Sequence, residues 1–209
     1  MAANADNRLA VQLQEYFDRL APTWDDELSS GTLNGLDNIV KELDIRPADH
    51  VLDIGSGTGV LLPFLIAKLA GQGEIVALDF SAEMLSQAQA KDFPPIVRFA
   101  QADVVAIPLD DNSVDLAICN SAFPHFNDKL GALKEIGRVL KSNGRLAICH
   151  TTGREMINQL HQSIGGMVGN HLLPDEFQVR ALTKQAGLEI THFEDGPQRY
   201  LVIAEKRAR

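Results

Sequence analysis

The sequence predicts an α/β fold: a seven-stranded, mostly parallel sheet with helices on both faces and an antiparallel hairpin at its C-terminal end. Short apolar runs alternate with longer stretches of helical periodicity along most of the 209 residues, which is the pattern of parallel strands joined by helices. A glycine-rich turn follows the first run. A short polar turn separates the last two runs, and so short a connection predicts a hairpin.

The predicted strands are short runs rich in Val, Ile, Leu and Ala, bounded by residues that favour turns. Five of them, at 50–55, 74–80, 96–103, 114–120 and 145–150, form the parallel part of the sheet. The last two, at 188–193 and 200–204, flank a turn at 194–197.

Helical periodicity and capping residues place the helices. Two are expected before the sheet, at 7–20 and 33–43, and another begins after the glycine-rich turn. Ser81 is a good N-cap for a helix at 82–91, and Asn143 and Gly144 end a helix at 128–140 whose apolar residues share one stripe. Further helices are expected at 153–167 and 175–186, the second closed by Gly187.

Composition and charge limit the classes of function. The formal net charge of -9 argues against nonspecific nucleic-acid binding, because neutralising phosphates needs a surplus of Lys and Arg. The most apolar stretch, 60–67, is too short to span a bilayer and contains Pro63. The first residues lack the apolar segment of a signal peptide. We therefore expect a cytoplasmic protein that binds neither nucleic acid nor membranes.

Cys119 and Cys149 both lie in apolar runs. Two buried strand residues are expected, because free cysteines are among the most buried side chains. A thiol pair that holds a soft metal or metalloid is the alternative, but nothing in the spacing supports it. No repeat and no long linker marks a second domain, so one domain is expected.

The most informative segment runs from Val51 to Gly59 and reads Val-Leu-Asp-Ile-Gly-Ser-Gly-Thr-Gly. Glycines between a strand and a helix permit a tight turn and let the backbone approach a ligand closely. The fingerprint of a dinucleotide site is Gly-x-Gly-x-x-Gly, whereas the third glycine here comes one residue early. An NAD(P)-dependent oxidoreductase is therefore a disfavoured alternative.

Three carboxylates, Asp53, Asp79 and Asp103, stand at or just before the carboxyl ends of the first three predicted strands. Those strand ends line the ligand crevice in open α/β sheets. An acidic rim would repel a pyrophosphate but suits a ligand with a sulfonium, an ammonium and two ribose hydroxyls. Asp79 has the position expected of the acid that accepts hydrogen bonds from the ribose.

At these residues the chain resembles the Rossmann-type methyltransferases that use S-adenosylmethionine (SAM), especially the branch that includes quinone-biosynthesis C-methyltransferases and many small-molecule enzymes. The run 51–59 resembles the first motif of the family, 78–85 its ribose-binding segment and 100–104 its adenine-binding segment. The run 107–116 resembles the approach to the fourth strand. The run 135–146 resembles the segment before the fifth, with Asn143 where the family commonly has a second Gly.

The resemblance implies a Rossmann-like fold, SAM as cofactor and a set of site residues. It implies that Asp103 accepts a hydrogen bond from the adenine amino group, that the Val104 amide faces a ring nitrogen and that Phe80 packs on the adenine. Gly55 and Asn120 would border the methionine moiety. The expected cofactor-binding residues are Tyr16, Asp53, Gly55, Gly57, Gly59, Asp79, Phe80, Asp103, Val104 and Asn120.

Residues 16–25 resemble the lid segment of the same family. This segment contains three aromatic residues, Tyr16, Phe17 and Trp24. We expect it to close over the cofactor and exclude water. The chain then divides into lid helices at 1–48, a cofactor-binding core at 49–150, and acceptor-side helices with the C-terminal hairpin at 151–209.

The sequence gives fewer indications of the acceptor site. Methyl transfer needs in-line alignment and exclusion of water, and a base only where the nucleophile holds a proton of high pKa. His125, after the fourth strand, and His150, after the fifth, are candidates for that base. Each could equally hydrogen-bond a loop carbonyl or cap a helix.

Arg154, Asn158 and His161 share one face of the helix after the fifth strand. They could bind an acceptor that carries a carboxylate or another oxyanion, or they could form an exposed polar face. A rival pocket, for an apolar acceptor, would use Phe123, Phe126 and Met156. No metal is expected, because the spacing of His125, His150, His161 and His171 fits no standard zinc pattern. Phe123, Arg154, Asn158 and His161 are taken as the candidate substrate-binding residues.

Two functions remain open. The first is a methyltransferase that transfers a methyl group from SAM to a small-molecule acceptor. The second is a SAM-binding partner or sensor protein without transferase activity. Both require the three carboxylates, and only the first requires an accessible acceptor pocket.

Overall fold

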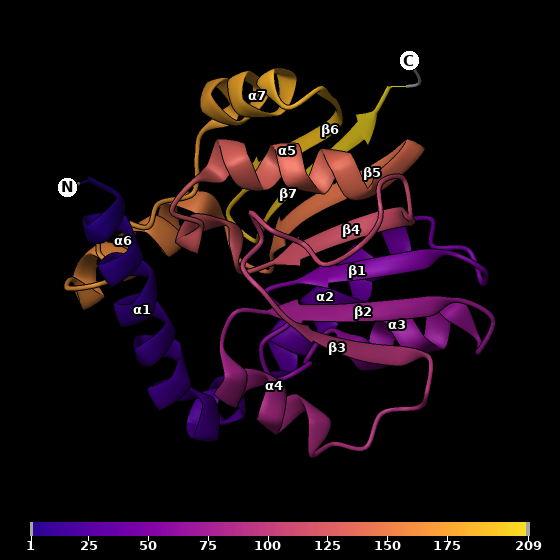
Figure 1. Cartoon of the computed structure of the whole chain (residues 1–209), viewed down its shortest axis with the longest axis horizontal. Helices are drawn as coiled ribbons and strands as arrows, with labels where there is room; N and C mark the ends of the chain where they lie inside the picture. The colour runs from indigo at the N-terminus through magenta and orange to yellow at the C-terminus, as the bar shows by residue number, and fades with distance from the viewer. Residues whose placement is uncertain (1, 208–209) are drawn as a thin grey trace.

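The computed structural model describes residues 2–207, with side chains from Arg8 onward. One sheet of seven strands runs through it in the order β3-β2-β1-β4-β5-β7-β6, with helices on both faces (Figure 1). The strands from β3 to β5 are parallel, and β7 is antiparallel to both β5 and β6. This confirms the predicted fold class. The strands are β1 (His50–Ile54), β2 (Glu74–Asp79), β3 (Val97–Gln101), β4 (Val114–Asn120), β5 (Leu140–His150), β6 (Leu188–Gly196) and β7 (Arg199–Lys206).

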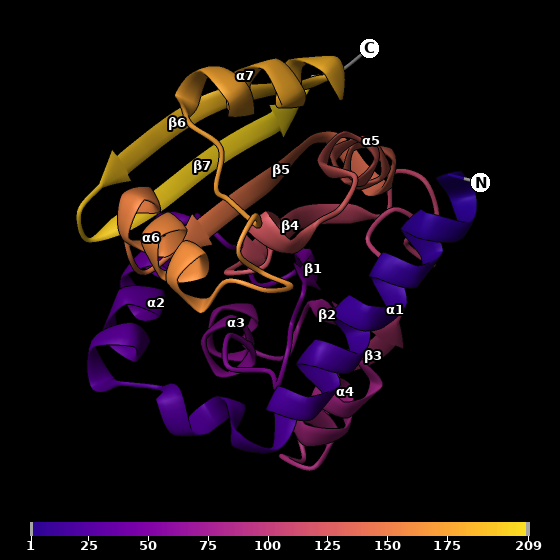
Figure 2. The same ribbon diagram turned by 90° about the vertical axis from the view of Figure 1, so that its left-hand side faces the viewer.

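The helices cover the sheet in two layers. On one face, α2 (Ser30–Glu42) and α3 (Leu62–Leu69) pack against the sheet, and α4 (Ala82–Gln89) continues this layer; α5 (Lys129–Val139) and α7 (Glu176–Gln185) cover the other face. α1 (Ala2–Leu20) and α6 (Arg154–Ile164) lie beyond the carboxyl ends of the parallel strands (Figures 1 and 2). Two short 3-10 helices, Ala21–Glu27 and Phe123–His125, follow α1 and β4.

Sequence accounts for the helix starts. Ser81 caps α4 as predicted, because its side chain accepts a hydrogen bond from the Met84 amide at 3.1 Å. Asp128 caps α5 in the same way through the Gly131 amide. Asp175 begins α7 with a reciprocal capping box to Gln178. Side-chain acceptors of this kind satisfy amides that have no partner inside the helix.

The boundary between α5 and β5 differs from the prediction. Leu140 was expected in the helix, but it pairs with Val114 as the first residue of β5. The register then shifts, and pairing resumes between Leu116 and Arg145 around a bulge in which Asn143 has a φ of 64°. Leu140 is buried in either arrangement, so its apolar character could not distinguish helix from strand.

Other predicted boundaries were also wrong: α1 begins at Ala2 and α2 at Ser30, where 7 and 33 were expected. α6 was expected to reach 167 but ends at Ile164, because Gly165 and Gly166 both adopt positive φ, at 66° and 53°. The hairpin strands are longer than predicted: Gly196 pairs with Arg199, which leaves a turn of two residues instead of 194–197. Within residues 2–207, no helix combines the length and hydropathy that crossing a bilayer requires.

Candidate cofactor and acceptor site

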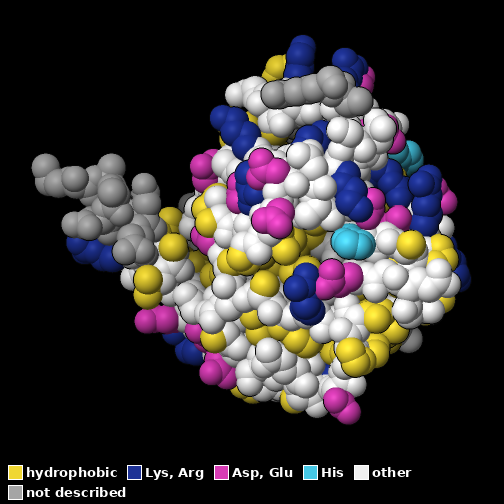
Figure 3. Space-filling view, turned by 45° about the vertical axis from the view of Figure 1, so that its right-hand side comes forward, with side chains coloured by type: hydrophobic (Ala, Val, Ile, Leu, Met, Phe, Trp, Pro, Cys, Tyr) yellow, Lys and Arg dark blue, Asp and Glu magenta, His cyan; other side chains and the backbone are white. Residues whose placement is uncertain are grey.

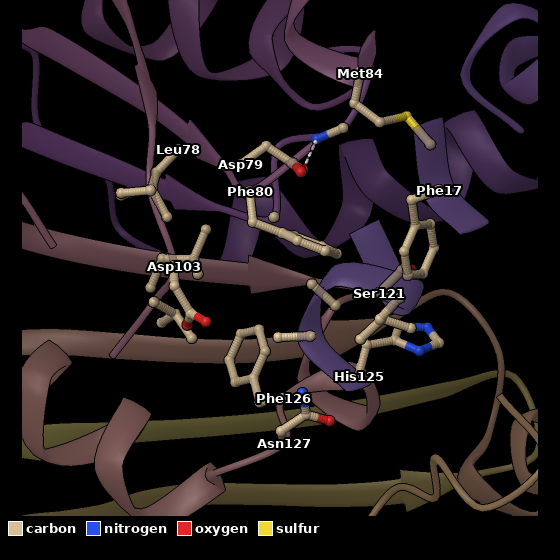
Figure 4. A pocket seen from close by; sticks show the side chains of 18 residues that line it. Phe17, Leu78, Asp79, Phe80, Met84, Asp103, Ser121, His125, Phe126 and Asn127 are labelled. Atoms are coloured by element: carbon tan, nitrogen blue, oxygen red, sulfur yellow. Dashed lines mark hydrogen bonds between the residues drawn. The ribbon is translucent and has the colours of Figure 1, made fainter. Parts of the chain in front are cut away.

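A cavity of about 770 Å³, counting the space at its open side, lies beyond the carboxyl ends of β1, β2 and β4. The strand order reverses between β1 and β4, which is where open α/β sheets bind ligands. Figure 4 shows Asp79 and Phe80 from the end of β2, Asp103 from the loop after β3, His125 and Phe126 from the segment after β4, and Phe17 from α1 around it. Among the described residues that line it, two are Asp and none is Lys or Arg.

The glycine-rich loop forms one wall of the cavity. Gly55 has a φ of +67°, and a Cβ at this position would overlap the Cβ of Ala122. The amides of Gly55 and Ser56 donate hydrogen bonds to the Leu78 carbonyl at 2.8 and 3.0 Å, so the loop folds over the end of β2. Gly57, with a φ of +54°, also lines the cavity. Only glycine combines this backbone conformation with so close an approach.

Asp79 is held at the floor of the cavity by the backbone. Its Oδ2 accepts a hydrogen bond from the Gly57 amide at 2.8 Å, and its Oδ1 accepts one from the Ser81 amide at 2.9 Å (Figure 4 shows the first). Burial raises the pKa of Asp79, whereas these amide donors lower it in part. A carboxylate oxygen has more than one lone pair, so both oxygens can still accept from a ligand.

Asp53 does not lie on the acidic rim of the ligand crevice, where we expected it. It is buried within β1 and does not line the cavity, and its Oδ2 has no hydrogen-bond partner in the described part of the chain. Burial, with a smaller effect from Asp79, raises the pKa of Asp53 to about 7. Asp53 and Ile54 are successive residues of β1, so their side chains point to opposite faces of the sheet. The Asp53 carboxylate therefore lies on the face that carries Cys149, beneath the glycine loop.

The other predicted cofactor residues divide into two groups. Phe80, Asp103 and Val104 line the cavity, although β3 ends at Gln101 and Asp103 therefore lies on the following loop, where its Oδ1 accepts from the Val105 amide at 3.1 Å. Gly59 and Asn120 do not line it. Gly59 packs beneath the loop against Leu62, Phe93 and Ala88, and Asn120 is 3.8 Å from the Cys149 thiol.

α1 closes one side of the cavity, with Phe17 rather than Tyr16 in the lining. Ala10, Leu13 and Phe17 recur at helical spacing and share the inner face, whereas Tyr16 packs edge-on against Phe17. The Phe17 ring makes edge contacts with Phe80 and His125, at centroid distances of 5.8 and 5.1 Å. The N-terminal helix therefore contacts two of the side chains that line the cavity, Phe80 and His125.

Polar contacts tie this segment to the cofactor loops. Ser81 donates a hydrogen bond from Oγ to Asp18 at 2.5 Å. Thr58 and Lys91 both donate to Asp25, at 2.5 and 2.6 Å. These positions carried no signal of their own in the sequence, because the contacts join residues more than thirty positions apart.

The two candidate bases lie in different environments. His125 lines the cavity, and its Nδ1 lies 3.1 Å from Nδ1 of His171. His150 is buried under Tyr200 and does not line the cavity, and its Nε2 has no partner among the described residues. Burial lowers the pKa of His125 well below its usual value and that of His150 to about 3, with further lowering from His161 in both cases. Both are neutral at neutral pH.

The predicted acceptor residues of α6 are not brought together at the cavity. Arg154 pairs with Asp195 of the hairpin, with Nε donating to Oδ2 at 2.6 Å. Asn158 forms two hydrogen bonds with the Leu173 backbone, at 3.1 and 2.7 Å. His161 is buried and hydrogen-bonds the His171 carbonyl. Asn158 and His161 thus fix the segment after α6, and Arg154 ties the start of α6 to the hairpin, so the shared face that the sequence showed has an internal role.

The alternative acceptor pocket of Phe123, Phe126 and Met156 is present only in part. Phe126 lines the cavity, whereas Phe123 is fully buried behind it at a centroid distance of 5.5 Å, and Met156 is 61% exposed. Cys119 and Cys149 are buried, as expected. Within the described residues, no group of three or more His, Cys, Asp and Glu side chains is arranged to hold a metal ion.

Comparison with known proteins agrees with this geometry. Residues 52–148 match the model of a methyltransferase domain. Over this segment the chain is similar to the Rossmann-type methyltransferases. It is 32% identical over 146 residues to a 2-phytyl-1,4-naphtoquinone methyltransferase of Trichormus variabilis, a match that covers 66% of this chain and 63% of that protein. The chain thus spans less than two thirds of the length of this relative.

Solved structures of low identity share the fold. A SAM-dependent methyltransferase of Aquifex aeolicus is 24% identical with a TM-score of 0.71, and the match covers 92% of this chain and 98% of that one. The [4+2]-cyclase SpnF is 16% identical with a TM-score of 0.76, over 95% and 96% of the two chains. Because one neighbour is named a cyclase, this fold does not by itself determine the reaction.

The cavity fits SAM better than a dinucleotide. It offers carboxylates at Asp79 and Asp103 and no cationic side chain among its described lining residues, so it would attract a positively charged ligand and repel a pyrophosphate. The positive φ of Gly55 and Gly57 lets the loop line the cavity with backbone alone. The unpartnered oxygens of Asp53 and Ser56, at the base of this loop, are further groups that a polar ligand or its bound water would satisfy.

Proposed function

We propose that the protein is a methyltransferase that transfers a methyl group from SAM to a small-molecule acceptor. The observation that supports this most is the cavity itself: a glycine loop, two lining carboxylates and aromatic side chains at the reversal point of the sheet, with no Lys or Arg among the described lining residues. When bound, SAM supplies a methyl group on a positively charged sulfur.

Asp79 would accept hydrogen bonds from the ribose hydroxyls, because its two oxygens are fixed by the Gly57 and Ser81 amides and keep lone pairs. Asp103 and Val104 would bind the adenine, with Phe80 packed against it. The Asp53 carboxylate would act from beneath the loop on the ammonium group. These assignments remain proposals carried over from the family pattern.

The acceptor would bind between Phe126, His125 and the inner face of α1. The walls there are apolar and aromatic, so we propose a small aromatic acceptor of limited polarity rather than the oxyanion that Arg154 suggested. The relative from Trichormus is named for a naphthoquinone substrate, and a reduced 1,4-naphthoquinone is therefore a suitable first probe. His125, but not His150, lies where it could contact such an acceptor.

We also propose that residues 1–48 act as a lid, that 49–150 bind the cofactor and that 151–209 shape the acceptor side. The Phe17 contacts and the Asp25 hydrogen bonds support the first part. The surface charge of the protein supports a small-molecule acceptor over nucleic acid. On the face in Figure 3 the described Lys and Arg side chains are interspersed with Asp and Glu and form no separate basic patch. A cytoplasmic location belongs to the same proposal.

Incubation of the protein with methyl-labelled SAM and a reduced 1,4-naphthoquinone tests this function. We expect label in the acceptor and stoichiometric S-adenosylhomocysteine, both strongly reduced with the Asp79→Ala variant at micromolar SAM. Binding of S-adenosylhomocysteine without any transfer, to this probe or to a panel of phenols, thiols and amines, would favour the alternative of a SAM-binding partner protein without activity.

A further inference from the structure

Three histidines from three separate segments meet beside the cavity. His125 follows β4, His161 lies on α6, and His171 lies in the segment after α6. His125 and His171 are joined by a hydrogen bond between their Nδ1 atoms at 3.1 Å. The His125 ring also lies near those of His161 and His171, with centroids 5.0 and 5.3 Å away.

The partners determine where the protons lie. A backbone carbonyl only accepts hydrogen bonds, so His161 must donate from Nδ1 to the His171 carbonyl. Between His125 and His171, one Nδ1 must carry the proton and the other must be bare, because two bare or two protonated nitrogens cannot hydrogen-bond. If His125 is the donor, its Nε2 has a free lone pair, and Nε2 is the only ring nitrogen left for a molecule in the cavity.

The surroundings of His125 keep it neutral. Phe17 lies edge-on at a centroid distance of 5.1 Å, and His150 and His161 are the other imidazoles that affect it. The Lys129 ammonium, which donates to the Pro124 and Phe126 carbonyls, opposes a second positive charge at His125. Burial, together with these neighbouring groups, lowers the pKa of His125 and so disfavours its protonated form. His171 is partly exposed to solvent, and it is in direct contact with His125.

We propose that His171 is the positioning residue for His125 and its route for proton release. In the resting state His125 donates from Nδ1 to a bare Nδ1 of His171 and presents a bare Nε2 to the acceptor. As the acceptor atom bonds to the methyl group, His125 Nε2 takes the acceptor proton, the Nδ1 proton passes to His171, and His171 releases its Nε2 proton to water. The net products are methylated acceptor, S-adenosylhomocysteine and one proton.

This inference rests on the proposed function, since it assigns a role within that reaction. It is distinct from a role for His150, whose Nε2 is buried and does not reach the cavity. It also explains why Asn158 and His161 are tied to the backbone of Leu173 and His171. Those hydrogen bonds fix the segment that carries the His171 ring.

Nitrogen NMR of the imidazole rings tests the geometry without any acceptor. Long-range proton–nitrogen spectra of the labelled full chain, saturated with S-adenosylhomocysteine, should show His125 neutral with a protonated Nδ1 and a bare Nε2. The His171→Phe variant should lose this preference, whereas His171→Gln should keep it, because the Gln oxygen can accept from Nδ1. The His192→Gln variant, altered at an exposed histidine of β6, is the control. A protonated Nε2 in the wild type, or an unchanged spectrum in His171→Phe, overturns the proposal.

Kinetics separate positioning from proton release. With methyl-labelled SAM and a reduced 1,4-naphthoquinone, both His171→Gln and His171→Phe should lower kcat at least about 10-fold, a modest part of the usual contribution of a base. The KM for SAM should stay within about 2-fold of the wild-type value. Wild-type kcat in His171→Gln would overturn the release route. If the wild type transfers no methyl group, the proposed function fails at this acceptor, and the NMR result still decides the arrangement of the histidines.

Discussion

Thr58 of the glycine loop and Asp25 of the N-terminal segment are joined by a 2.5 Å hydrogen bond from the threonine hydroxyl to the carboxylate. Lys91, at the end of the α4 region, donates to the other oxygen of Asp25 and to the Thr58 carbonyl, at 2.6 and 2.7 Å. A segment before the sheet is thus held on the loop that would contact the cofactor. This contact joins the proposed lid to the cofactor site.

Replacing Asp25 by Asn should loosen the lid. The variant keeps the shape of the side chain but loses the ion pair with Lys91, and since both partners are partly exposed, we expect a loss of about 1 kcal/mol or less. Amide exchange of residues 21–27 should become faster, and the emission of Trp24 should respond less to S-adenosylhomocysteine. Asp26→Asn, at the exposed neighbouring position, is the control. Equal protection in the two variants would remove Asp25 from the lid contact.

Replacing Gly55 by Ala should be far more harmful than the same change at Gly71. Both glycines have positive φ, +67° and +78°, so both variants pay the left-handed strain of about 1–2 kcal/mol. At Gly71 a new Cβ meets nothing within 4 Å, whereas at Gly55 it overlaps Ala122. Overpacking should add about 1–3 kcal/mol and reduce affinity for S-adenosylhomocysteine. Urea denaturation and calorimetry measure the two effects, and equal losses of stability would contradict the close approach.

Asp53 should make stability depend on pH. Its folded pKa is about 7 because of burial and the nearby Asp79, against an ordinary aspartate pKa of 3.8. Between these values the folded chain binds a proton that the unfolded chain has released. The stability that Asp53 contributes is therefore full below pH 3.8 and is lost as the pH rises through about 7.

An Asp53→Asn variant should consequently gain stability relative to the wild type as the pH rises from 5 to 7, on the order of 1 kcal/mol per pH unit. Urea denaturation at several pH values gives the difference. Asp110→Asn, on an exposed loop, should show no such trend. A constant difference between wild type and Asp53→Asn over this range would show that the buried carboxyl group ionises normally.

Local patterns predicted the sheet, because each strand is an apolar run and each connection carries its own capping or turn residues. Ser81 and Gly187 are examples: each acts on the few residues beside it. The motif from Val51 to Gly59 predicted the cofactor loop for the same reason. The predicted ends of helices and strands were wrong where an apolar residue such as Leu140 would be buried in either a helix or a strand.

The acceptor side could not be predicted in this way. Arg154, Asn158 and His161 share a helix face, but their partners Asp195, Leu173 and His171 come from segments that only the tertiary fold brings near. Likewise, Phe17 and Tyr16 are adjacent aromatic residues, and the rotation of α1 decides which one lines the cavity. Side chains that pair across long sequence distances follow no fixed spacing, so a single sequence does not reveal which residues pair.

Calorimetric titration with SAM tests the central claim most directly. We predict binding in the micromolar range, about -8 kcal/mol. The Asp79→Ala variant should bind more weakly by about 1.5–3 kcal/mol, because the ribose hydroxyls lose a charged acceptor, whereas Asp110→Ala should bind as the wild type does. Binding of NADH with no detectable binding of SAM would contradict the account.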